Sequence, residues 1–151
     1  LAAASLVLAP AAHAQYRNEV PHNPASCNSG GPKIRVNVSG VKVSKGTIRV
    51  QAYYGTKADW LEKGRWLTRV EAPARAGNMT FCLPVPEAGT YGVAVRHDLN
   101  GNGKTDLSED GGAMSNNPSI NIFNLGKPSY KKTAFTAGSG VTTISVTMKY
   151  M

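Results

Sequence analysis

Apolar and polar residues alternate along much of this chain. The alternation is clearest at 34–38, 79–83 and 91–95, where every second residue is aliphatic or aromatic. Successive side chains of a β-strand point to opposite faces of its sheet, so this period predicts strands that bury one face. Weaker patterns of the same kind predict four more strands, at residues 48–54, 65–71, 131–135 and 142–150.

The two strands that come first in the chain, at 34–38 and 48–54, are predicted to form a hairpin. The turn between them, at 40–46, contains two glycines. Residues 56–63 break the alternation and predict a single helical turn, which Gly64 would end. This turn would place Trp60 and Leu61 in the core. The rest of the chain has almost no helical pattern.

About seven short strands and almost no helix indicate an all-β fold, specifically an antiparallel β-sandwich of immunoglobulin or prealbumin type. One local pattern agrees with that class. Pro86, Gly89 and Tyr91 resemble the turn followed by a tyrosine that opens a strand in such sandwiches.

Residues 1–14 are uncharged and mostly apolar, and they end in a small-x-small triplet. This pattern is typical of a secretory signal peptide whose charged front end would precede the first residue. Pro10 disfavours the alternative, a buried helix. No stretch provides the roughly 20 apolar residues of a membrane span. We therefore expect an exported protein, periplasmic or extracellular, with an irregular arm at 15–32 and one β-sandwich domain at 33–151.

The chain has two cysteines, Cys27 and Cys82, which permit a single pairing. In an oxidising compartment two cysteines of a small domain are typically bonded, so we predict a disulfide between them. The alternative is a reactive or metal-binding cysteine. It is disfavoured because neither residue lies in a CxxC motif or beside a histidine.

The formal net charge is +8, yet four of the nine acidic residues lie within residues 98–110. The chain is therefore basic except for one acidic loop. Its lysines and arginines are scattered along the sequence, which is typical of a solvated surface. Such a surface also suits contact with anionic envelope polymers, lipopolysaccharide or acidic polysaccharide, whereas nucleic acid is not an expected partner there.

The acidic loop matches a calcium-binding pattern. Residues 98–109 fit D-x-[DN]-x-[DN]-G-x5-E at every specified position. Calcium takes roughly six to eight oxygen ligands, and alternate residues of a tight loop can point oxygens at one centre. The predicted ligands, the fourth through its backbone carbonyl, are Asp98, Asn100, Asn102, Lys104, Asp106 and Glu109. Because two of them are neutral amides, we expect a weak site, with Kd of about 10⁻⁴–10⁻³ M.

Two alternatives stay open for this loop. Asn-Gly occurs at 100–101 and again at 102–103, and this dipeptide is a strong turn signal, so an ordinary solvated turn would have a similar sequence. If calcium does bind, either Glu109 or Asp110 is placed to complete its ligand shell.

The sequence of the loop is also similar to that of a known family. The string His-Asp-x-Asn-x-Asn-Gly-Lys-x-Asp begins at His97 and leads to Ser-Asn-Asn at 115–117. With the strand patterns around it, this string resembles a family of exported bacterial proteins, the domain of unknown function 2141, over about residues 33–150. One part departs from the family pattern: the stretch that leads from the loop to Ser-Asn-Asn, residues 110–114 here, is shorter than in the family. The resemblance implies export and a β-sandwich, and it implies no activity.

The reactive residues disfavour an enzyme. Beyond the predicted signal peptide the histidines are His22 and His97, and neither a Gly-x-Ser-x-Gly nor an HExxH motif occurs. His97 and Asp98 are neighbours on a strand and point to opposite faces, which argues against a hydrolytic trio with Ser115. We expect a non-catalytic binding or structural module whose calcium-ordered loop contacts an envelope component. The alternative is a metal-independent binder of anionic envelope polymers.

Overall fold

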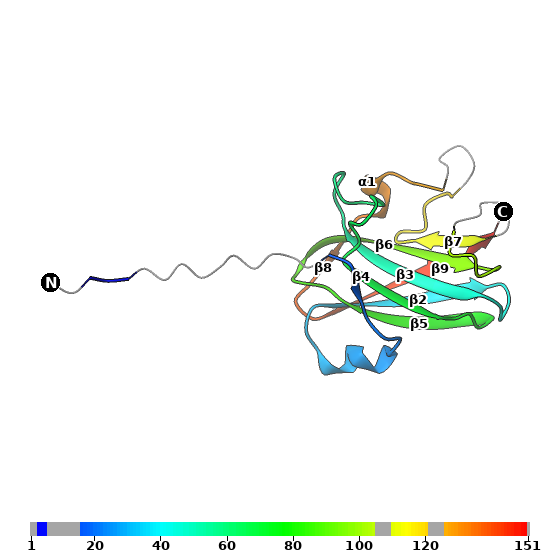
Figure 1. The fold of residues 1–151 in the computed structure, drawn as a ribbon, viewed down its shortest axis with the longest axis horizontal. Helices are drawn as coiled ribbons and strands as arrows, with labels where there is room; N and C mark the ends of the chain where they lie inside the picture. Colours follow the sequence, from blue (N-terminus) through cyan, green and yellow to red (C-terminus); the bar gives the residue numbers. More distant parts are fainter. Residues whose placement is uncertain (1–2, 6–15, 105–109, 121–125, 151) are drawn as a thin grey trace.

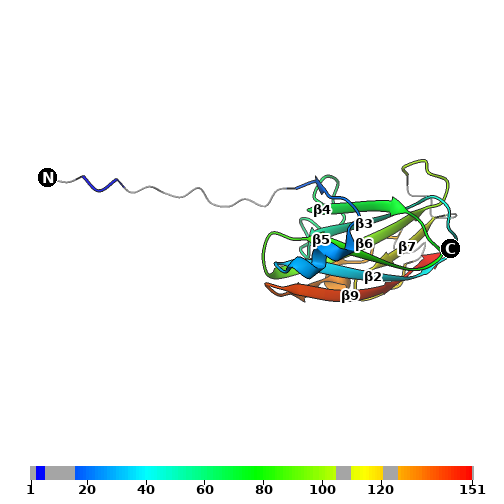
Figure 2. The same ribbon diagram turned by 90° about the horizontal axis from the view of Figure 1, so that it is seen from below.

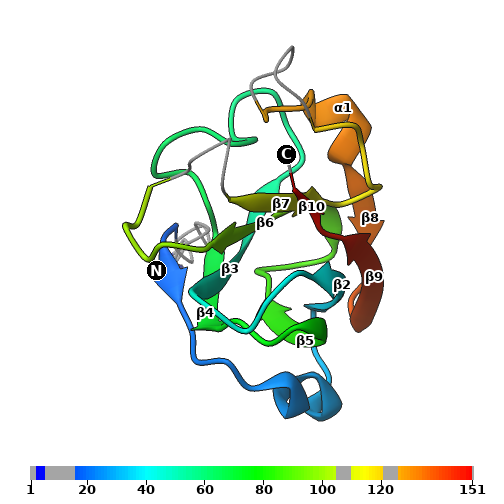
Figure 3. The ribbon, with the colours of Figure 1, turned by 90° about the vertical axis from the view of Figure 1, so that its right-hand side faces the viewer.

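Two β-sheets packed face to face form the fold (Figures 1 and 3). The computed structural model describes residues 3–5, 16–104, 110–120 and 126–150. The larger sheet has the order β1-β4-β3-β6-β7-β10, and β8 also pairs with β6. In that order its strands are β1 (Asn18–Glu19), β4 (Thr68–Pro73), β3 (Thr47–Tyr54), β6 (Gly89–Asp98), β7 (Gly111–Met114), β10 (Lys149–Tyr150) and β8 (Phe135–Ala137). The smaller sheet consists of β5 (Gly77–Pro84), β2 (Lys33–Val41) and β9 (Val141–Thr147).

The predicted alternation builds the core between the two sheets. Ile34, Val36 and Val38 of β2 are at most 1 % exposed, while the residues between them are half-buried. Val50 and Val93 face them from the larger sheet and are fully buried. Each such aliphatic side chain contributes about 1.5–3 kcal/mol to stability when it leaves water. The prediction of an all-β sandwich is confirmed.

The strand pattern in detail differs from the prediction. The described residues contain ten strands, several of them very short, and two pairs, β1 with β4 and β2 with β9, are parallel. The predicted strand at 131–135 is wrong: Tyr130–Thr133 forms the helical turn α1, and β8 follows it. Ser129 caps this turn by accepting a hydrogen bond from the amide of Lys131. The alternation of apolar and polar residues does not reveal such a capping bond.

The predicted hairpin of the first two strands is also wrong. β2 pairs with β5 and β9 in the smaller sheet, whereas β3 pairs with β4 and β6 in the larger one. The turn at 42–46 therefore carries the chain from one sheet to the other (Figure 2). Alternation tells which face of a strand is buried but not which strand lies beside it, so it could not distinguish the two arrangements.

The tyrosine of the turn pattern makes a corner contact that the sequence did not predict. The hydroxyl of Tyr91 donates a 2.6 Å hydrogen bond to the carbonyl oxygen of Glu87, in the turn that precedes its strand. Its ring is fully buried and stacks on Tyr54, with 5.6 Å between ring centroids. The contact fixes the entry into β6, the strand that leads to the acidic loop.

The arm at 15–32 is attached to the domain at two places. Cys27 lies in the 3₁₀ helix η1 (Pro24–Ser29) and is bonded to Cys82 of β5, which confirms the predicted disulfide. Ahead of it, β1 runs parallel to β4 and forms the edge of the larger sheet. The arm is thus partly regular, where the sequence predicted none. Of the predicted signal peptide, only residues 3–5 are among those described.

Within the described ranges no helix has the length and apolar character needed to cross a membrane.

Candidate functional site

The acidic loop connects β6 to β7 at one end of the larger sheet, and its two ends are held together. Asp98, the last residue of β6, and Asp110, just before β7, are 5 % and 6 % exposed. The amide of Leu99 donates a 3.1 Å hydrogen bond to Oδ1 of Asp110. The loop therefore begins and ends at buried carboxylates, and the residue after Asp98 is hydrogen-bonded to Asp110 across its base.

The Asp98 carboxylate organises the first half of the loop. Its Oδ1 accepts from the amide of Gly101 at 3.0 Å, and its Oδ2 accepts from the amide of Gly103 at 2.8 Å. Both glycines have positive φ, 69° and 74°, which side chains with a Cβ rarely adopt. Since a carboxylate oxygen has two lone pairs, these bonds leave each oxygen able to accept or ligate once more.

The two asparagines form similar local turns. Oδ1 of Asn100 accepts from the amide of Asn102 at 3.1 Å, and Oδ1 of Asn102 accepts from the amide of Lys104 at 2.8 Å. Side chains of this type stabilise turns by this bond alone. The described part of the loop therefore brings Asp98, Asn100 and Asn102 together in one tight turn sequence, as both the calcium and the turn interpretation expect.

The structure does not describe two of the predicted side-chain ligands. Asp106 and Glu109 lie outside the described residues. In the part of the chain that is described, no group of three or more His, Cys, Asp or Glu residues is arranged to hold a metal. What the loop offers there is carboxylate, amide and carbonyl oxygen, a hard donor set that fits calcium and does not fit zinc or copper.

His97 anchors the base of the loop. It is fully buried, with Nε2 2.6 Å from the carbonyl oxygen of Lys45 and Nδ1 2.7 Å from the hydroxyl of Tyr150. A carbonyl can only accept, so this geometry places a proton on Nε2. In the neutral ring Nδ1 then accepts from the Tyr150 hydroxyl. That hydroxyl accepts in turn from the amide of Lys42 at 3.0 Å. The histidine thus joins the end of β6 to the 42–46 turn and to β10.

The Ser-Asn-Asn motif fastens the chain where it leaves β7. The hydroxyl of the fully buried Ser115 donates to the carbonyl oxygen of Thr133 at 2.6 Å and accepts from the amide of Val93 at 3.0 Å. Nδ2 of Asn116 donates to the carbonyl oxygens of Lys132 in α1 and of Ala134 just after it, at 3.1 and 3.0 Å. Oδ1 of Asn117 accepts from the amide of Thr147 in β9 at 2.9 Å. All three side chains connect backbone segments.

Ser115 therefore has a clear structural role that a variant can test. Replacing it with alanine leaves the Val93 amide and the Thr133 carbonyl buried without their partner, and each such group costs about 1–3 kcal/mol. We expect Ser115→Ala to lower the free energy of unfolding in urea by about 2–4 kcal/mol. Ser39→Ala is the control, because the half-buried Ser39 makes longer bonds of 3.3 and 3.2 Å to β9. Equal losses for the two variants would contradict this role.

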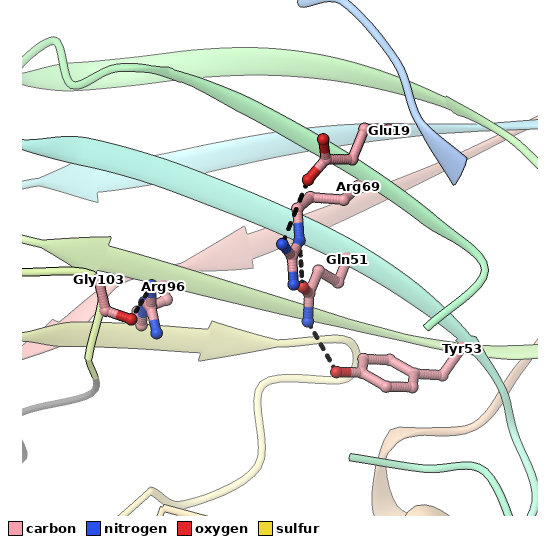
Figure 4. A network of polar contacts seen from close by, with 6 residues as sticks. All are labelled: Glu19, Gln51, Tyr53, Arg69, Arg96 and Gly103. Carbon is pink, nitrogen blue, oxygen red and sulfur yellow. Dashed lines mark hydrogen bonds and ion pairs between the residues drawn. The ribbon is translucent and has the colours of Figure 1, made fainter. Parts of the chain in front are cut away.

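A polar network on the outer face of the larger sheet was not predicted (Figure 4). Nε of Arg69 donates to Oε1 of Gln51 at 2.6 Å, and Nε2 of Gln51 donates to the hydroxyl of Tyr53 at 2.7 Å. Arg69 also lies 3.3 Å from the Glu19 carboxylate. The residues come from β1, β3 and β4, so no local pattern unites them. The sequence feature that could have pointed to this network is the presence of polar residues at outward-facing positions of predicted strands.

The same face also holds part of the acidic loop. Nη2 of Arg96 donates a 3.4 Å hydrogen bond to the carbonyl oxygen of Gly103 (Figure 4). Arg96 belongs to β6, so this bond attaches the exposed part of the loop to the sheet beneath it. The described part of the loop is therefore held at its base by Asp98 and Asp110 and along its side by an arginine.

Comparison with known protein families finds a match to the family described as "Uncharacterized protein conserved in bacteria (DUF2141)" over residues 36–145. The matched stretch runs from β2 to β9 and includes the acidic loop and the Ser-Asn-Asn motif. No curated protein matches the chain, and no solved structure matches it either.

Proposed function

This chain belongs to that uncharacterised bacterial family, and on this premise we propose that it is an exported, non-catalytic module whose 98–110 loop binds calcium. The observation that carries the proposal is that two buried carboxylates, Asp98 and Asp110, lie at the two ends of the loop, where the amide of Leu99 donates a hydrogen bond to Asp110. Burying negative charge is costly unless it is compensated. The amide bonds to Asp98 and Asp110 offset part of this cost, and a divalent cation coordinated by oxygens would offset more of it.

The residues that would hold the ion follow from the donor set. Asp98 would contribute its carboxylate, Asn100 and Asn102 their amide oxygens, and Lys104 its carbonyl oxygen. Asp106 and Glu109 would complete the shell, with Asp110 as the alternative to Glu109. A bound calcium supplies positive charge that cross-links the loop. The loop, held in one conformation, would then contact an envelope component, the partner class we propose.

Export is the second part of the proposal, and the disulfide supports it. Cys27 and Cys82 are joined, and such bonds persist in secreted and periplasmic proteins but are rare in the bacterial cytosol. The apolar run at 1–14 has the pattern of a secretory signal.

Calcium is expected to stabilise the protein measurably. At 10 mM calcium, a site with Kd of about 10⁻⁴–10⁻³ M stabilises the folded state by about 1.4–2.7 kcal/mol. For a domain of this size that raises Tm by several degrees. The measurement is thermal unfolding followed by circular dichroism in calcium, in magnesium and in chelator. A Tm equal in calcium and in chelator would overturn the calcium proposal and favour the ordinary turn.

A matched pair of variants locates the ion. Asp98→Asn should abolish the calcium-dependent rise in Tm, because it removes the carboxylate at the base of the loop. Asp59→Asn should retain the full rise, since Asp59 is equally buried but is bonded to Tyr16 and Arg65, away from the loop. The quantity compared is the response to calcium of each variant, so any loss of basal stability cancels. A rise that survives in Asp98→Asn contradicts the assignment.

A further inference from the structure

Three arginines lie on adjacent strands of the larger sheet, on the face directed away from the core. Arg69 is on β4, Arg49 on β3 and Arg96 on β6, and all three are half-buried. In the register of the sheet Arg49 lies directly opposite Arg96 on one side and Glu71 on the other. Arg69 lies opposite Gln51, two residues along β3 from Arg49 on the same face. The three arginines are therefore neighbours on this face, and we call them the arginine cluster.

The two outer members of the cluster are held in place. Arg69 donates to Gln51 and its guanidinium lies 4.0 Å from the ring centroid of Trp66. Arg96 donates to the carbonyl oxygen of Gly103. Planar guanidinium groups fixed in this way lose little further freedom when they bind an anion. The cluster is therefore preorganised from both sides.

The central arginine is poorly compensated. Within the described residues Arg49 makes no ion pair and no side-chain hydrogen bond. Burial, and then the positive charges of Arg96 and Arg69, lower the pKa of the Arg49 guanidinium to about 10. On the β4 side of Arg49, the described acidic residues are Glu71, which is exposed, and Glu19, whose side chain is 69 % exposed and lies against Arg69. Arg49 therefore lies in partly dehydrated surroundings beside two other positive charges.

We propose that the arginine cluster of Arg49, Arg69 and Arg96 binds a tetrahedral oxyanion, the phosphate or sulfate group of an anionic ligand. Guanidinium groups offer forked N–H donors that match the oxygens of such groups, and charge-assisted hydrogen bonds of this kind are the strong ones. A bound anion would also relieve the mutual repulsion of the three arginines. The site does not require calcium, so it is independent of the function proposed above.

The test compares the wild type with Arg49→Met and Arg35→Met. Arg35 is a half-buried arginine of β2 in the other sheet, bonded to Thr143, so it controls for the loss of one positive charge. Inorganic sulfate and inorganic phosphate are the probes, with chelator present and sodium chloride keeping the ionic strength constant. Binding is measured by titration calorimetry and by Tm.

We expect sulfate and phosphate to raise the Tm of the wild type in a saturable way. Arg49→Met should weaken binding about tenfold or more, as the loss of a hydrogen bond to a charged group does. It should also raise the Tm without ligand by a few degrees, because one of three repelling, partly buried charges is gone. Arg35→Met should bind like the wild type and should not gain stability.

Binding of a short heparin oligosaccharide distinguishes two possible ligands, a free anion and an anionic group carried on a polymer. Tighter binding of the oligosaccharide that is lost in Arg49→Met would mean that the group is borne by a sulfated polymer, and binding of the inorganic ions alone would mean a free anion. Either outcome supports the site. The proposal is overturned if the wild type responds to sulfate and phosphate no more than to chloride, or if Arg49→Met binds as tightly as Arg35→Met.

Discussion

Gly46→Ala is expected to destabilise the protein by about 3–5 kcal/mol, combining the cost of a left-handed backbone with that of overpacking. Gly46 has φ of 73°, and a Cβ at this position would lie 2.0 Å from the carbonyl oxygen of Asp98 and 2.9 Å from its carbonyl carbon. The obstacle is backbone, which cannot rotate away as a side chain can. The close approach of the 42–46 turn to the end of β6 therefore requires a residue without a side chain.

Urea denaturation of Gly46→Ala beside Gly64→Ala tests this expectation. Gly64 has nearly the same φ, 75°, but a Cβ there would meet nothing within 4 Å. Gly64→Ala should thus show the backbone cost alone, about 1–2 kcal/mol. If Gly46→Ala lost no more stability than Gly64→Ala, the contact with Asp98 would not constrain the turn. The same variant should also lose its response to calcium, since Asp98 would be displaced.

Removal of the disulfide should cost about 4 kcal/mol, a large part of the stability of about 5–15 kcal/mol that a domain of this size has. Cys27 and Cys82 are 55 residues apart in sequence. A cross-link over so long a loop restricts the unfolded chain strongly. Both residues are at most 3 % exposed, so the variant Cys27→Ala/Cys82→Ala keeps the site apolar.

The reduced wild type is the control for that variant, because it lacks the cross-link but keeps both sulfur atoms. Guanidinium denaturation should give the reduced protein and the double alanine variant similar losses relative to the oxidised protein. A reduced protein that unfolds within about 1 kcal/mol of the oxidised one would contradict the prediction, since it would mean that the cross-link leaves the unfolded chain unrestricted. If only the double alanine variant lost much stability, the loss would come from the packing of the removed sulfur atoms and not from the cross-link.

Burial periodicity predicted most of the strands but not their partners. The alternation of Ile34, Val36 and Val38 identified β2 and its core face, and the same pattern identified β5 and β6. It wrongly joined β2 to β3 in a hairpin. Pairing depends on contacts between residues far apart in the chain, such as those that place β9 beside β2, and a local pattern carries no information on them.

The acidic loop was found from its sequence because its oxygens repeat at alternate positions within a few residues. The structure supports the local part of that reasoning, since Asp98, Asn100 and Asn102 each accept bonds from amides of the same loop. The role of Ser115 was not predicted. Its two partners, Val93 and Thr133, lie on other elements, and only the folded chain brings them together.

By itself the sequence determined the local chemistry of this protein: which strand faces are apolar, which two cysteines can bond, and where a run of oxygen donors occurs. These depend on neighbouring residues and on composition, so they can be read along the chain. The tertiary structure alone decided that β2 and β3 lie in different sheets, that Gly46 contacts Asp98, and that Arg49 lies beside Arg96. Such contacts join residues about fifty positions apart. They are chosen by the packing of the whole core, whose free energy no single segment contains.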